Sequence, residues 1–212
     1  MLDICYNNDD CIEIGVDEVG RGPMFGRVYT AAVVLPKDNS FDHSKMKDSK
    51  KFHSKKKIKE VSDYIKTNAI HWSIKWEDEK VIDEINIRNA THSAMHKAIK
   101  EIYNIGKDTL LLIDGNDFKP FVIFNKTHLE QVPHITIEGG DNKYSSIAAA
   151  SILAKVARDE YIQELCKEYP DLIEKYDLEK NKGYGTKKHM DGIRNYGITE
   201  WHRKTFGICK NY

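Results

Sequence analysis

The chain has 212 residues, of which 40% are hydrophobic and 31% are charged, as expected for one globular domain or one domain with a small appendage. No stretch approaches the roughly 18 apolar residues of a membrane span, and the N-terminus lacks a signal-peptide pattern. A formal net charge of zero argues against binding nucleic acid through bulk charge alone. The four cysteines form no Cys-x-x-Cys pair, so neither a zinc site nor a disulfide framework is indicated. We therefore expect a soluble cytoplasmic protein.

Apolar alternation and short apolar runs predict five strands. They are Ile12–Val16, Val28–Leu35, Ala69–Lys75, Leu110–Ile113 and Ile135–Ile137. The fourth is apolar throughout, as a central strand buried on both faces should be.

Three helices are predicted between and after these strands. Ser54 caps the first, which ends near Asn68, and the second carries an apolar stripe from Ile87 to Ile102 and is closed by Gly106. The third begins near Ser145, and its small residues would let its backbone lie close to a neighbouring element.

This order of elements predicts an α/β fold with a central mixed sheet flanked by helices. Residues 1–168 would form the core. Residues 169–212 contain Pro170, several glycines and many basic and aromatic residues. We expect them to form a small helical C-terminal lobe packed on the core, because so short a segment can bury little apolar surface of its own.

The first candidate site lies where the first strand ends, at Asp17 and Glu18, followed by Gly20, Arg21 and Gly22. Carboxylates alone repel a phosphodiester, whereas carboxylates that hold magnesium present positive charge and an activated water. Neighbouring strand residues point to opposite faces, which is an objection to one shared site. A strand that ends at Val16, with glycines free to bend, would remove the objection.

Two further acids follow strand or turn signals. Asp114 comes directly after the central strand, where open α/β sheets tend to bind ligands, although Asp-Gly-Asn is also an ordinary turn sequence. Asp141 precedes the third helix, where taken alone it is more typical of a turn or cap residue.

Lysines and arginines crowd residues 45–59 and 180–204. Each run alone is typical of a solvated helix face or loop, but beside a metal site both become candidate phosphate contacts. Two other motifs fail. Arg21 and Gly22 stand where a phosphate-binding P-loop requires Lys and Ser or Thr, and Lys119 and Asn125 stand where a calcium loop requires Gly and Glu.

Taken together, several segments resemble the type 2 ribonucleases H in order and spacing, from residue 12 to about 207. They are Asp17–Pro23, Asp48–Lys51, Asn86–Ile87 with Ala90–Thr91 and Ala94–Met95, Leu112–Asn116, Gly140–Asp141, Ala148–Val156 with Arg158–Asp159, Gly183–His189, and His202–Arg203 with Phe206.

The resemblance implies a ribonuclease H-like fold in which Asp17, Glu18, Asp114 and Asp141 bind two divalent ions, Mg²⁺ or Mn²⁺, and carry catalysis. The implied reaction is hydrolysis of the RNA strand of RNA·DNA hybrids, and incision 5′ of single ribonucleotides in duplex DNA, leaving 5′-phosphates.

The resemblance also implies substrate contacts. The backbone of Gly20, Arg21 and Gly22 would contact the 2′-hydroxyl and the flanking phosphates, and Tyr184 would recognise the junction from ribonucleotide to deoxyribonucleotide by stacking. Lys50, in the Asp48–Lys51 segment, is a candidate substrate contact. The expected partners are RNA·DNA hybrid and duplex DNA containing ribonucleotides.

Some features set this chain apart from relatives. Phe25 and Arg27 stand where many have a small residue and a proline. The HIII type usually carries Gly-Lys-Gly and an extra N-terminal domain, so Arg21 favours the HII type. Because the C-terminus shows no evident tail for a partner, we expect a monomer. A catalytically silent hybrid-binding module and a metal nuclease without ribose discrimination remain as alternatives.

Overall fold

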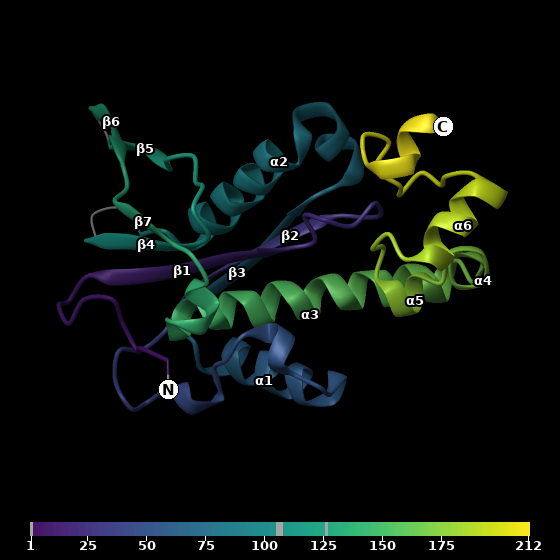
Figure 1. The fold of residues 1–212 in the computed structure, drawn as a ribbon. Coiled ribbons are helices and arrows are strands. Elements are labelled where there is room, and N and C mark those ends of the chain that lie inside the picture. Colours follow the sequence, from purple (N-terminus) through teal and green to yellow (C-terminus); the bar gives the residue numbers. More distant parts are fainter. Residues whose placement is uncertain (1, 105–107, 126) are drawn as a thin grey trace.

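A five-stranded mixed sheet, ordered β3-β2-β1-β4-β7, lies at the centre of the computed structural model, which describes residues 2–104, 108–125 and 127–212 (Figure 1). Its strands are β1 (Ile12–Val19), β2 (Val28–Val34), β3 (His71–Glu77), β4 (Thr109–Asp114) and β7 (His134–Ile137). Neighbours among β1, β2 and β3 pair antiparallel, whereas β4 runs parallel to β1 and to β7. The predicted α/β class with a mixed sheet is confirmed.

Helices cover both faces of this sheet. α1 (Lys55–Asn68) and α3 (Ser145–Glu168) lie on one face, and α2 (Glu79–Ile102) lies on the other (Figure 1). Alternation along the strands divides the core accordingly. Ala31 and Val33 pack with α1 and α3, whereas Ala32 and Val34 pack with α2.

Short elements connect the layers. Among the described residues, the 3₁₀ turns are η1 (His43–Lys45), η2 (Ser49–Lys51), η3 (Gly140–Asn142) and η4 (Gly207–Asn211). A separate two-stranded sheet, β5 (Val122–Asn125) with β6 (His128–Gln131), was not predicted from the sequence. These strands have only four residues each, too few for a clear period of two.

The C-terminal segment contains α4 (Asp171–Tyr176), α5 (Leu178–Asn181) and α6 (Lys187–Tyr196) at one end of the sheet (Figure 1). Its apolar residues share one cluster with Met24, Phe25 and Tyr29 and with the second half of α3. The segment therefore packs on the rest of the chain through a common core. A domain boundary at residues 168/169 remains a prediction.

Several predicted bounds were wrong. β1 does not end at Val16, because its pairing with β2 continues to Val19 opposite Tyr29. β2 ends one residue early, at Val34, and β3 begins later than predicted, at His71.

The second helix differs from its prediction at its start. It begins at Glu79, capped by Asp78, and an Asn86 in positive φ then interrupts it, so that the predicted stripe from Ile87 is its second part. It ends at Ile102, and Gly106 lies outside the described residues. The bounds of the first helix and the start of the third were predicted correctly.

All four cysteines are free thiols. Among the described residues, no helix is both long enough and apolar enough to cross a membrane.

Candidate active site

Two of the predicted catalytic acids lie side by side on the central strands. In the parallel pairing of β1 with β4, Val16 stands opposite Ile113, so the next residues, Asp17 and Asp114, meet at the carboxyl ends of the two strands. β4 ends there, whereas β1 continues for two more residues. The continuous apolar run of β4 thus buries the strand and delivers Asp114 to the sheet's edge.

Asp141 reaches the same place through η3. The amide of Gly140 donates a 2.6 Å hydrogen bond to Asp114 Oδ1, and the amide of Asp141 lies 3.4 Å from the same oxygen. Asp141 is buried at 5% exposure. Asp141 therefore lies in a turn, as its position in the sequence suggested, and the hydrogen bond from Gly140 to Asp114 holds this turn against β4.

Asp17 and Glu18 occupy opposite faces of β1, because the strand continues through both. Asp17 is buried on the α3 side, where the Ser151 side chain favours its charged form, and its Oδ1 accepts a 2.6 Å hydrogen bond from the amide of Glu18. Glu18 is partly exposed and lies 3.5 Å from the Arg21 guanidinium. The predicted end of the strand at Val16 is therefore not what brings these acids together; they approach Asp114 from two sides of the strand end.

The four acids act on one another electrostatically. Burial raises the pKa of Asp17 well above its usual range, and the charges of Glu18 and Asp114 raise it further. Burial also raises the pKa of Glu18 against the opposing charge of Arg21. For Asp141, burial and then the charge of Asp114 raise the pKa. The site therefore holds more negative charge than its protein neighbours neutralise.

A second layer of polar residues connects η2 to η3. The side-chain amide of Asn142 donates through Nδ2 to Asp48 Oδ2 at 3.3 Å and to Asp141 Oδ1 at 3.1 Å. Burial pushes the pKa of Asp48 upward, but the amide of Lys50 and the side chain of Asn142 outweigh it, so this pKa is lowered. The exposed Lys50 partly offsets the charge around Asp141.

The predicted substrate-contacting segments also meet. Gly20 has φ of +92°, and an added Cβ would lie 2.3 Å from Arg158 Nε, so this turn requires glycine. Arg21 and Gly22 are exposed. A Cβ on Gly22 would lie 3.6 Å from Tyr184 Cε1, and Tyr184 itself is 48% exposed.

Phe25 and Arg27, the two residues that differ from many relatives, both pack against aromatic side chains. Phe25 is fully buried against Trp201 and His202. The Arg27 guanidinium lies 3.7 Å from the ring centroid of Trp76 and 4.5 Å from that of Tyr161. Both residues therefore pack the base of the loop.

The donor set suits hard divalent cations, since carboxylate oxygens are the ligands that Mg²⁺ and Mn²⁺ prefer. Burial, and then the charges of neighbouring acids, raise the pKa values of Asp17 and Asp141, and a bound divalent cation would supply positive charge to these carboxylates. In the described part of the chain, no three His, Cys, Asp or Glu side chains are arranged, as they stand, to hold an ion. Metal ligation by these four acids is therefore taken up below as a proposal.

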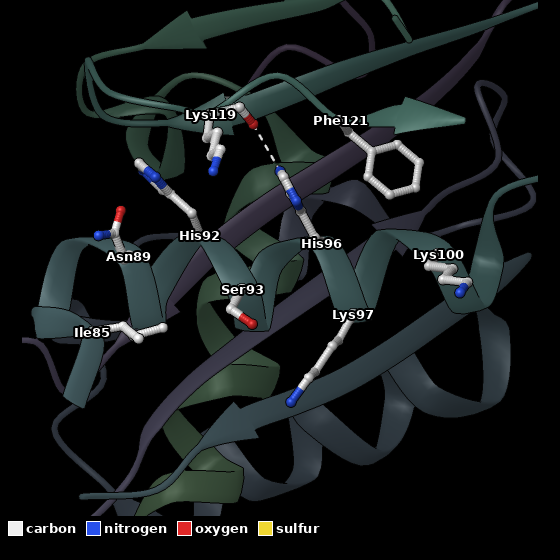
Figure 2. Close-up of a pocket in the computed structure, with 9 residues that line it drawn as sticks. All are labelled: Ile85, Asn89, His92, Ser93, His96, Lys97, Lys100, Lys119 and Phe121. Atoms are coloured by element: carbon white, nitrogen blue, oxygen red, sulfur yellow. Dashed lines mark hydrogen bonds between the residues drawn. The ribbon is translucent and has the colours of Figure 1, made fainter. Parts of the chain in front are cut away.

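A cavity of about 520 Å³ lies elsewhere, between α2 and residues 119–121 (Figure 2). His96 Nε2 lies 2.7 Å from the carbonyl of Lys119 at its wall. None of the four acids lines this cavity; its lining is Ile85, Asn89, His92, Ser93, His96, Lys97, Lys100, Lys119 and Phe121. The acids instead lie at the end of the sheet beside exposed loops.

Sequence reasoning gave no role to several residues that shape the site. They are Asp48, Asn142, Ser151 and Arg158, together with Arg203, which was a candidate phosphate contact but is fully buried and binds backbone carbonyls instead. All five lie within or beside segments that carry the family resemblance, which indicates that they matter but not what each one does. Their contacts join residues more than 90 positions apart, and a local pattern contains no such information.

Comparison with known proteins gives consistent results. A family model described as Ribonuclease HII matches residues 14–209. A ribonuclease HII of Phocaeicola vulgatus is 45% identical over 205 residues, covering 96% of this chain and 92% of the relative. The solved ribonuclease H2 of Pyrococcus horikoshii has a TM-score of 0.73 at 21% identity, over 94% of this chain and 95% of the other. A structure of Bst-RNase HIII in complex with Mn²⁺ has a TM-score of 0.67 at 18% identity, covering 94% of this chain and 68% of the other.

Proposed function

Since this chain belongs to the ribonuclease HII family and is a metal-dependent endoribonuclease, we propose that it hydrolyses the RNA strand of RNA·DNA hybrids and cuts 5′ of single ribonucleotides in duplex DNA. The observation that supports the proposal is that Asp17, Asp114 and Asp141 gather at the carboxyl ends of β1 and β4. Glu18 lies beside Arg21 of the next loop, whose Gly22 is close to Tyr184.

In this proposal Asp17, Glu18, Asp114 and Asp141 hold two divalent ions, Mg²⁺ or Mn²⁺. Bound ions of this kind lower the pKa of an attacking water and stabilise charge on the departing 3′ oxygen. The carboxylates supply the hard oxygen ligands. The amides of Gly140 and Asp141 fix Asp114, and the amide of Glu18 fixes Asp17, so two of the ligands are held in place before substrate arrives.

Substrate selection is assigned to the exposed loop and to the C-terminal lobe. The 2′-hydroxyl is the group that separates RNA from DNA at a given position. The backbone of Gly20, Arg21 and Gly22 would contact it, since glycine permits close approach. Tyr184 would stack on the next sugar, and Lys50 would contact a phosphate. The lobe of residues 169–212 would contribute Tyr184 to substrate binding. We also expect the enzyme to act as a monomer.

The direct test replaces Asp114 by Asn. We expect cleavage of a ribonucleotide-containing duplex in Mg²⁺ or Mn²⁺ to fall by about 10³-fold or more, the scale of losing one preorganised electrostatic contact at a reaction centre. Binding of the hybrid should change little. Adding a chelator to the wild type should likewise stop cleavage, and resupplying Mn²⁺ should restore it.

The matched control is Asp191→Asn, which removes an acid that pairs with Arg194 on α6. This variant should cut at the wild-type rate. A wild type that binds the duplex but never cuts it would identify a silent binding module instead. Equal cutting of an all-DNA duplex would identify a nuclease without ribose discrimination.

A further inference from the structure

The loop of residues 20–27 is held from beneath by the buried side chain of Arg203. Its guanidinium donates to four backbone carbonyls of the loop: Gly20 at 2.6 Å, Pro23 at 2.8 Å, Gly26 at 2.8 Å and Arg21 at 3.0 Å. Arg203 is 0% exposed. A planar guanidinium can serve several carbonyls at fixed angles, which a lysine ammonium cannot do.

Arg158, on α3, holds the other end of the same loop. It donates to the carbonyls of Phe25 at 3.1 Å and Arg27 at 3.2 Å, and also to the carbonyl of Lys182 at 3.1 Å. Lys182 lies two residues before Tyr184. The amide of Met24 also donates to the carbonyl of Gly183 at 2.9 Å. Arg158 therefore joins the loop to the segment that carries Tyr184.

Within the described part of the chain, neither arginine is in direct contact with an acid, although the charges of Glu79 and Asp83 act on Arg203 from a longer distance. Among the described residues, no carboxylate lies within 4.0 Å of either guanidinium, and all seven of their hydrogen bonds go to backbone carbonyls. Burial lowers the pKa of Arg203 to about 9 and also lowers that of Arg158. Burying an unpaired charge costs stability, so stability alone does not account for this pair.

The peptide geometry shows what the carbonyl contacts achieve. In a trans peptide the C=O of one residue and the N–H of the next point in opposite directions, and the described chain contains no cis peptide. Since Arg203 draws in the carbonyls of Gly20 and Arg21, the amides of Arg21 and Gly22 must point away from it. In the described structure neither amide has an acceptor, whereas those of Met24 and Gly26 donate to Gly183 and Trp201.

We propose that Arg203 is a specificity-determining positioning residue, which aims the free amides of Arg21 and Gly22 at the ribose hydroxyl and its phosphates, while Arg158 fixes their spacing from Tyr184. This inference rests on the proposed function and deepens it. Neither arginine need touch the substrate. Their charge also contributes a positive potential beneath a loop that receives a polyanion.

The test compares the Asp114→Asn variant with the double variant Asp114→Asn, Arg203→Lys. The shared Asp114→Asn change allows binding to be measured without cleavage. The readout is the ratio of dissociation constants for an all-DNA duplex and for the same duplex with one ribonucleotide. We expect the ratio to fall about tenfold, the worth of one well-aligned hydrogen bond. In the otherwise wild-type enzyme, KM for the single-ribonucleotide substrate should rise by a larger factor than kcat falls.

The matched control is Ile193→Ala. Ile193 belongs to the apolar cluster that also contains Met24 and Phe25 of the loop, so its truncation opens a cavity there but removes no hydrogen bond to a loop carbonyl. It should lower thermal stability and leave the ratio unchanged. If Arg203→Lys lowers stability but leaves the ratio at its wild-type value, the positioning role is refuted.

Amide hydrogen exchange in the Asp114→Asn protein tests the same point without altering either arginine. The amides of Arg21 and Gly22 should exchange fast in the free protein and become more strongly protected by the ribonucleotide-containing duplex than by the all-DNA duplex, which offers phosphates but no ribose hydroxyl. Equal protection by both duplexes would overturn the inference. If the wild type does not cut the ribonucleotide duplex at all, the proposed function itself fails, which is a distinct result.

Discussion

At the scale of single residues, the site combines buried acids with exposed contacts. Asp17 and Asp141 are almost completely buried, yet their neighbours Arg21, Gly22, Lys50 and Tyr184 are exposed. The buried carboxylates are fixed by protein hydrogen bonds, whereas the exposed residues are available to a large substrate. Tyr184 illustrates the second group, because its ring lies beside Gly22 and keeps almost half of its surface accessible.

Replacing Tyr184 by Ala tests this residue. We expect cutting at a lone ribonucleotide to fall about tenfold or more, within the range that aromatic stacking on a nucleotide is worth. Cutting inside a long RNA·DNA hybrid should fall much less, since no junction needs to be read there. Tyr196→Ala, which removes another exposed tyrosine of the same lobe, is the control. Equal losses on both substrates would remove Tyr184 from the assigned role.

At the scale of elements, α3 organises the site from below β1. Gly15 lies so close to the start of α3 that an added Cβ would stand 2.3 Å from the backbone carbon of Ser146. This contact confirms the prediction that a helix rich in small residues would allow a close approach. Further along α3, Ser151 favours the charged form of Asp17, and Arg158 reaches the loop after β1. A single helix thus positions both the acids and the substrate loop.

Gly15→Ala should therefore be strongly destabilising. The new methyl group meets backbone rather than a movable side chain, so we expect the free energy of unfolding to fall by about 3 kcal/mol, the upper end of overpacking costs. Urea denaturation measures this. The control Gly139→Ala meets no atom within 4 Å but has φ of +63°, so it should cost only about 1 kcal/mol from left-handed backbone. Equal costs would contradict a steric cause at Gly15.

At the scale of the whole molecule, the C-terminal segment returns to complete the loop after β1. Arg203 binds that loop, and two buried histidines connect the returning segment to Tyr184. The amide of Thr199 donates to His202 Nδ1 at 2.9 Å, so His202 Nε2–H donates to His189 Nε2 at 3.1 Å. His189 Nδ1–H then donates to the carbonyl of Tyr184 at 3.0 Å. The chain of bonds requires both rings to be neutral.

This arrangement predicts acid sensitivity. Burial, and then the neighbouring His189, lower the pKa of His202 from 6.5 to about 3. The unfolded chain therefore takes up a proton as pH falls below about 6.5, whereas the folded protein does not until about 3. Stability is full above this window and falls within it by up to about 1.4 kcal/mol per pH unit for one such group.

Urea denaturation at several pH values between 6.5 and 4 measures the slope. The Gln side chain of His202→Gln does not titrate, so the free energy of unfolding should depend less steeply on pH in this variant than in the wild type. His189 should account for part of the remaining pH dependence. Ile193→Val is the control for a general loss of packing and should keep the wild-type slope. Identical slopes for His202→Gln and the wild type would contradict the prediction.

The sequence alone determined the fold class, most element positions and the four acids as candidates, because these depend on local periodicity and on long shared segments. It set the bounds of β1 wrongly, since the end of a strand depends on how far its partner continues. Only the tertiary structure decided how Asp17 and Glu18 approach Asp114 from two faces of one strand. It also revealed Arg158 and Arg203 beneath the substrate loop, because their partners are backbone carbonyls, which every residue possesses and no sequence pattern distinguishes.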